Sequence, residues 1–180
     1  MMTTPQPWRQ SYPEGMPADI DTAAYASLLD LLDRACKKHA DRIACVAFGS
    51  ALTYRELDRQ ALALASWLQS LSLPAGSRIA LMMPNVPAYL VALLGVLRAG
   101  HVLVNINPLF TPRELQGQLQ DSGARVIVVL ENFAHTLEQV QGCEALEHRV
   151  VVGPGDLLGW YKRPLLNFVV RHVKKMVPAW

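Results

Sequence analysis

The sequence is poor in lysine, and the few lysines that it has are unevenly placed. They stand at Lys37, Lys38, Lys162, Lys174 and Lys175, so that none occurs in the long central stretch and three fall in the last nineteen residues. A phosphate-binding P-loop needs a lysine in the pattern GxxxxGK[ST] between a strand and a helix. No strand-to-helix junction of this chain offers that lysine, and a P-loop is therefore excluded.

Cysteine is equally scarce, and long apolar runs are missing. Cys36, Cys45 and Cys143 are odd in number and widely spaced, which argues against a disulfide framework and against a structural zinc site. The longest apolar stretch, "VPAYLVALLGVLRAG", is shorter than the roughly 20 residues that span a bilayer. The opening "MMTTPQPWRQSYPEGMP" has no apolar core of the signal-peptide type. We expect a cytoplasmic chain, with contact to the inner membrane surface left open.

The net charge is small and the apolar content is high. A formal charge of +2 gives no basic face of the kind that nucleic acid requires, so no nucleic-acid partner is expected. Hydrophobic residues make up 51% of the chain and charged residues 18%, which is enough apolar material for a buried core. The chain is therefore expected to fold rather than to remain disordered.

The order of apolar and polar segments predicts an α/β fold, a mostly parallel sheet with helices on both faces. Residues 27–40 are expected to form a helix, 42–53 a hairpin, and 78–83, 101–106, 124–130 and 148–152 apolar strands covered on both faces, separated by helices. Such alternation is typical of βαβ units. Three helix starts can also be predicted. Thr53 with Glu56 and Thr111 with Glu114 form capping boxes, and Asn85 is the expected cap of the helix between them.

Two groups of residues at strand ends could hold a ligand. One group follows the last strand and consists of Gly153, Gly155 and Gly159. Its spacing misses the nucleotide-binding pattern GxGxxG by one residue. A nucleotide-binding loop is one interpretation, but we expect an ordinary exposed loop. Asn105 and Asn107 end another strand. They could line a pocket, but hydrogen bonds to the backbone of the turn are the simpler expectation.

The histidines and cysteines give no catalytic set. His39, His101, His148 and His172 lie at element edges or in the last helix, and His135 with Glu138 is a single pair without further metal ligands. We expect each of these histidines at the surface, and Cys36 and Cys45 as small buried hydrophobic residues. No serine, cysteine or aspartate has a base beside it. No catalytic, cofactor-binding or metal-binding residue is assigned.

Several motifs resemble the AMP-forming adenylating enzymes. "LTYREL" (52–57) is similar to the first core motif of that family. "LRAGHVLVNINP" (97–108) is similar to the second, with arginine in place of lysine and asparagine before the final proline. "PNVPAYLVALLGVLRAGHVLVNINPLFTPREL" and "DSGARVIVV" look like bacterial long-chain fatty-acid–CoA ligases, as do the "W…YPEG" opening and the closing "RHVKKMVPAW". The likeness covers nearly the whole chain except residues 153–159.

The resemblance implies an enzyme that uses ATP and Mg²⁺ to activate a fatty acid as acyl-AMP and then transfers the acyl group to coenzyme A. Family members are much longer, and their phosphate loop, adenine-binding motif, hinge aspartate and catalytic lysine have no counterpart here. We therefore expect an N-terminal portion of such a ligase, inactive alone. A ligase for shorter or aromatic acids, a non-catalytic module that docks on a membrane or partner, and a small nucleotide binder using 153–159 are the alternatives. The chain could also form a homodimer.

The expected organisation is an N-terminal tail (1–26), an α/β subdomain of the AMP-binding domain (27–160) and a basic amphipathic helix with the end of the chain (161–180). Within the last part, residues 163–177 place apolar side chains on one broad arc of a helix and Arg163, Asn167, Arg171, Lys174 and Lys175 on the other. We expect the apolar face to pack on the enzyme and the basic face to be solvated. Peripheral contact of 163–177 with the inner membrane is the competing hypothesis.

Overall fold

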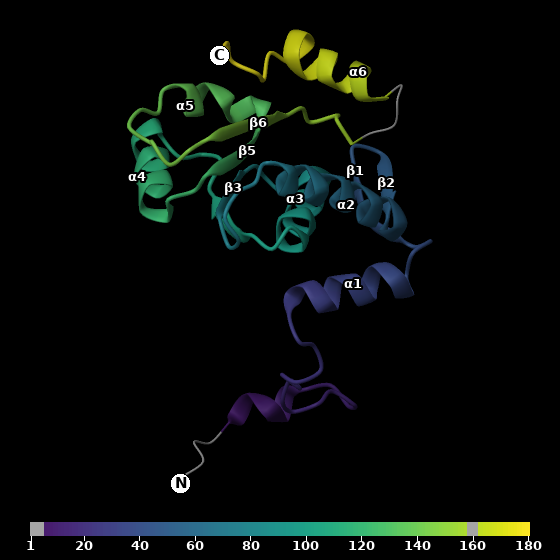
Figure 1. The fold of residues 1–180 in the computed structure, drawn as a ribbon. Coiled ribbons are helices and arrows are strands. Elements are labelled where there is room, and N and C mark those ends of the chain that lie inside the picture. The colour runs from purple at the N-terminus through teal and green to yellow at the C-terminus, as the bar shows by residue number, and fades with distance from the viewer. Residues whose placement is uncertain (1–5, 158–161) are drawn as a thin grey trace.

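The computed structural model describes residues 6–157 and 162–180 (Figure 1). In chain order the described elements are η1 (Pro7–Ser11), α1 (Leu28–Lys38), β1 (Ile43–Ala47), β2 (Ser50–Thr53), α2 (Tyr54–Ser70), β3 (Arg78–Met82), α3 (Pro87–Arg98), β4 (Val102–Ile106), α4 (Pro112–Ser122), β5 (Val126–Leu130), η2 (Glu131–Phe133), α5 (Ala134–Glu138), β6 (His148–Val152), α6 (Lys162–Phe168) and the π-helical turn η3 (Val169–Val173). Strands β1 and β2 form the expected antiparallel hairpin. The other strands form a parallel sheet in the order β4-β3-β5-β6.

Helices cover both faces of the parallel sheet, as the sequence predicts. On one face, Ala80 and Met82 of β3 pack with Leu115 and Leu119 of α4. On the other face, alternate residues of β3 and β5 pack with Leu68 of α2 and with α3. Because successive side chains of a strand point to opposite faces, the central strands must be apolar throughout. The α/β fold class is confirmed.

The outer strands correct one expectation. Residues 101–106 were expected to form a strand covered on both faces, but β4 is an edge strand, and the side chain of Val102 is 49% exposed. At the other edge, Val151 of β6 is also exposed. Apolar composition does not separate a central strand from an edge strand, because the order of strands is set by packing between distant segments.

Local signals predict two of the three helix starts. In both α2 and α4 the threonine hydroxyl accepts a hydrogen bond from the glutamate N–H, and the glutamate carboxylate accepts one from the threonine N–H. Asn85 is not the cap of α3, because Val86 takes that position without a side-chain hydrogen bond. The residue before a proline is held in extended backbone, and Pro87 therefore moves the start of the helix one residue on.

The C-terminal segment is shorter as a helix than the expected 163–177. Helix α6 ends at Phe168, the π-helical turn ends at Val173, and Lys175 has a positive φ of 50°. Pro178 restricts the residue before it to extended backbone, which ends the helical segment before Val177.

Arg98, at the end of α3, connects three helices. Its Nη2 atom donates to Asp33 of α1 over 2.7 Å and also to the Asp58 carboxylate of α2, while Nη1 donates to the Asp58 carbonyl over 3.0 Å. Burial lowers the pKa of the Arg98 guanidinium, but the hydrogen bonds and charges of the two aspartates outweigh burial and leave its pKa raised. A planar fork can hold two carboxylates at once, whereas an ammonium group is a point charge.

We predict that Arg98→Met lowers the free energy of unfolding by roughly 2–4 kcal/mol, because it leaves Asp33 and Asp58 beside each other without a cation. Arg98→Lys should lose less, since it keeps the charge but not the fork. The matched control is Arg55→Met, whose ion pair with Asp41 is exposed, and which should lose less than about 1 kcal/mol. Urea denaturation followed by circular dichroism measures all three, and equal losses for Arg98→Met and Arg55→Met would contradict the prediction.

The capping boxes predict a dependence of stability on pH. Hydrogen bonds from the threonine N–H and hydroxyl groups lower the pKa values of Glu56 and Glu114. A carboxyl whose pKa is lowered on folding stabilises the protein above its unfolded pKa, and this contribution is lost as the pH falls through the folded value. Below about pH 4.3, the ordinary glutamate pKa, the E56Q/E114Q variant should therefore lose stability less steeply than the unchanged chain.

The charge-matched control for this measurement is E14Q/E144Q, because both of these glutamates lie outside the capping boxes. Thermal unfolding is measured for each variant between neutral and acidic pH, and the dependence of the melting temperature on pH is compared. The explanation fails if E56Q/E114Q and the unchanged chain have the same acid slope.

Candidate functional site

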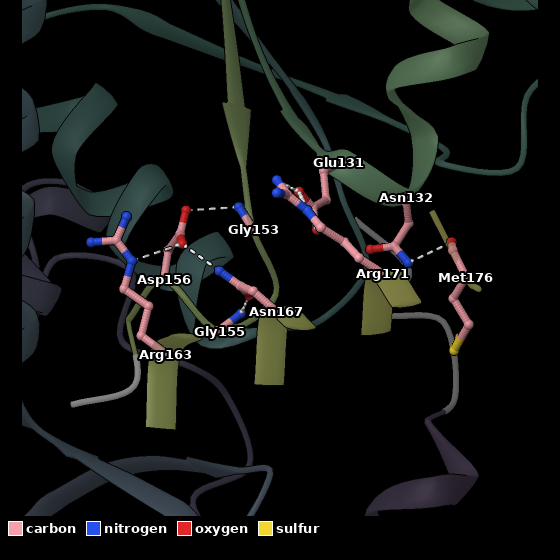
Figure 2. A network of polar contacts seen from close by, with 9 residues as sticks. All are labelled: Glu131, Asn132, Gly153, Gly155, Asp156, Arg163, Asn167, Arg171 and Met176. Atoms are coloured by element: carbon pink, nitrogen blue, oxygen red, sulfur yellow. Dashed lines mark hydrogen bonds and ion pairs between the residues drawn. The ribbon is translucent and has the colours of Figure 1, made fainter. Parts of the chain in front are cut away.

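The carboxyl ends of β5 and β6 form the candidate site, since open α/β sheets bind ligands at this edge. Three segments meet there: η2 directly after β5, the loop 153–157 directly after β6, and the C-terminal segment α6–η3. Figure 2 shows the polar contacts that join them. We refer to Glu131, Gly153, Gly155 and Asp156 as the helix seat, because they hold α6 and η3.

The first contact of the seat is the pair between Glu131 and Arg171. The Glu131 side chain is only 1% exposed, and both of its carboxylate oxygens accept hydrogen bonds from Nε of Arg171, at 3.2 and 3.0 Å. The hydrogen bonds and the negative charge of Glu131 raise the pKa of the Arg171 guanidinium. A buried carboxylate without a cation is strongly unfavourable, so this pair fixes which side of η3 faces the domain.

The second contact is made by Asn167, near the end of α6 (Figure 2). Its side-chain oxygen accepts a hydrogen bond from the Gly155 N–H over 2.8 Å, and its amide donates to Asp156 over 3.0 Å. The other Asp156 oxygen accepts from the Gly153 N–H over 2.8 Å. The backbone N–H groups that a phosphate would need in this loop are therefore already bonded within the chain.

The two glycines are needed for close approach and not for unusual backbone angles. A Cβ atom at Gly153 would lie 2.8 Å from the side-chain nitrogen of Asn167, and one at Gly155 would lie 2.7 Å from its side-chain oxygen and 2.9 Å from the Arg163 carbonyl oxygen. Both glycines are buried. The expectation of an ordinary exposed loop is therefore wrong for Gly153 and Gly155, while Gly159 lies outside the described residues.

The C-terminal segment meets the expectation for its two arcs in part. The apolar arc was expected to pack inward; Leu166 and Val170 are half-buried, whereas Leu165, Phe168 and Val173 are exposed. The polar arc was expected to be solvated, and its basic residues are exposed, namely Arg163, Arg171, Lys174 and Lys175. Asn167 is half-buried instead, because its side chain satisfies the N–H of the glycine loop.

The asparagines at the end of β4 have different hydrogen-bond partners. Asn107 accepts a hydrogen bond from the Leu109 N–H over 3.0 Å, which confirms the expected turn contact. The Asn105 side chain instead accepts from the Tyr89 hydroxyl over 3.1 Å. The expectation of a backbone partner is wrong for this side chain, because a hydroxyl from α3 reaches the end of the strand.

The histidines differ in how far they are exposed. His172 is exposed, as expected, and contacts Phe168, with ring centroids 5.0 Å apart and ring planes tilted by 43°. His101 is buried, which corrects the expectation of a surface position; it lies between the end of α3 and the start of β4, where packing closes over it. His39, His135 and His148 are half-buried, so none of them is fully at the surface either. Across residues 6–157 and 162–180, no three potential metal ligands come together.

The cysteines provide no nucleophile. Cys36 is buried, as expected, and Cys45 is half-buried. Burial raises the pKa of the thiols of Cys36, Cys45 and Cys143, which disfavours the reactive thiolate form.

An apolar groove, which the sequence did not predict, lies between α2, α3 and β6. It has a volume of about 300 Å³, and its lining includes Leu64, Val128, Val150 and Leu157, with Gln60 as the polar member. Such a groove can receive an apolar group, but its lining has no acid, base or nucleophile.

Replacing glycine by alanine should change the free energy of unfolding in opposite directions inside and outside the seat. Gly155→Ala should lower the free energy of unfolding by roughly 1–3 kcal/mol, because the new methyl group overlaps Asn167 and the Arg163 carbonyl. The control is Gly117→Ala in the exposed middle of α4, where a Cβ meets nothing within 4 Å. There alanine should stabilise the chain by about 0.5–1 kcal/mol.

Hydrogen exchange locates the effect of Gly155→Ala, since the Gly153 and Gly155 amides and those of η3 should lose protection while those of β3 keep it. Unchanged exchange at these amides would show that the helix does not depend on the seat.

The chain is similar to curated long-chain fatty-acid–CoA ligases. It is 49% identical to that of Haemophilus influenzae and 46% identical to that of Escherichia coli O157:H7, in each case over 174 residues, which is 96% of this chain. In both comparisons the chain spans 31% of the length of the relative.

The fold is also similar to that of a solved CoA ligase. The benzoate CoA ligase of Burkholderia xenovorans LB400 superposes with a TM-score of 0.64 at 31% identity, over 70% of this chain and 26% of that protein. The family model described as AMP-binding enzyme matches residues 32–170, a range that begins in α1, contains the whole sheet and reaches into η3. The chain belongs to the AMP-binding enzyme family.

Proposed function

We propose that this chain is the N-terminal portion of an AMP-forming ligase that joins a long-chain fatty acid to coenzyme A. The observation that carries the proposal is the identity of nearly one half, over almost the whole chain, to long-chain fatty-acid–CoA ligases. Membership of the AMP-binding family implies the use of ATP. Coenzyme A, Mg²⁺ and the fatty acid belong to the proposal for the longer enzyme.

The glycine loop after β6 does not offer its N–H groups to a phosphate. The loop N–H groups of Gly153 and Gly155 are bonded to Asp156 and Asn167, and the described part of the chain offers no cluster of metal ligands. We therefore assign this chain no catalytic, cofactor-binding or metal-binding residue and no step of the reaction. Its part in the enzyme is that of scaffold: a tail (1–26), an α/β subdomain (27–160) and a C-terminal helical segment (161–180).

The place of the enzyme in the cell is a further part of the proposal. We infer a cytoplasmic enzyme with peripheral contact to the inner membrane through residues 163–177, where apolar side chains are exposed. Among the described helices we find none with both the length and the apolar character needed to cross a bilayer.

The alternatives differ in substrate or in class. A ligase for shorter or aromatic acids is less favoured because the curated relatives at 45–49% identity are ligases for long-chain acids. A non-catalytic docking module is less favoured because the match to an enzyme family includes the whole sheet. A nucleotide binder using 153–159 is not supported by the bonded N–H groups of the loop.

The test is a comparison of carboxylic acids with the longer enzyme, measured by release of pyrophosphate and AMP in the presence of ATP, Mg²⁺ and coenzyme A. We expect palmitate to be preferred over butyrate and benzoate by at least roughly tenfold in kcat/KM, since added methylene groups bind in an apolar site. The 180-residue chain is the matched control and should release neither product. A preference for benzoate would contradict the substrate, and turnover by the short chain would contradict the scaffold role.

A further inference from the structure

We draw no further inference here: the strongest candidate, the apolar groove between α2, α3 and β6, belongs to a chain that spans only 31% of the length of its relatives, and nothing in the described part of the structure shows what covers it.

Discussion

The buried carboxylate of Glu131 is the constraint on which the placement of the C-terminal segment α6–η3 depends. It follows directly after β5, where the sheet ends, and it is covered almost completely by protein. A carboxylate in that position needs a cation, and the chain provides one from forty residues further on, in Arg171. Arg171 makes this contact from the surface, since its own side chain is 50% exposed.

The glycine loop after β6 follows from the same constraint. The Asn167 side chain comes close to the backbone of the loop, and a side chain at Gly153 or Gly155 would prevent that approach. The loop therefore serves packing, although its glycines suggest a nucleotide site.

Sequence reasoning predicted what depends on near neighbours along the chain. The capping boxes join residues three apart, and the alternation of apolar strands and helices gives a parallel sheet without knowledge of distant contacts. Asn85 failed as a cap although the signal is local, because Pro87 restricts the preceding residue more strongly than a side-chain oxygen attracts the helix start. The exposed edge position of β4 could not be predicted, since strand order is a long-range property.

The helical projection of residues 163–177 shows the limit most clearly. It separated apolar from polar residues, but it could not tell which members of each arc contact the protein, because the contact of Arg171 with the buried Glu131 joins segments far apart in the sequence. The resemblance to the adenylating enzymes had a similar limit. The family motif "LRAG" has arginine where lysine is usual, and only the structure shows that this Arg98 holds Asp33 and Asp58 together with its planar fork.

A double-mutant cycle between Glu131→Gln and Arg171→Met tests the central claim, that this pair sets the orientation of the C-terminal segment. The free energy of unfolding is measured for the unchanged chain, both single variants and the double variant. A coupling free energy on the order of 1–3 kcal/mol, with the double variant losing less than the sum of the two single losses, is the predicted result. Additive losses would show that the two residues do not interact in solution, and the segment would then have to be held by another contact.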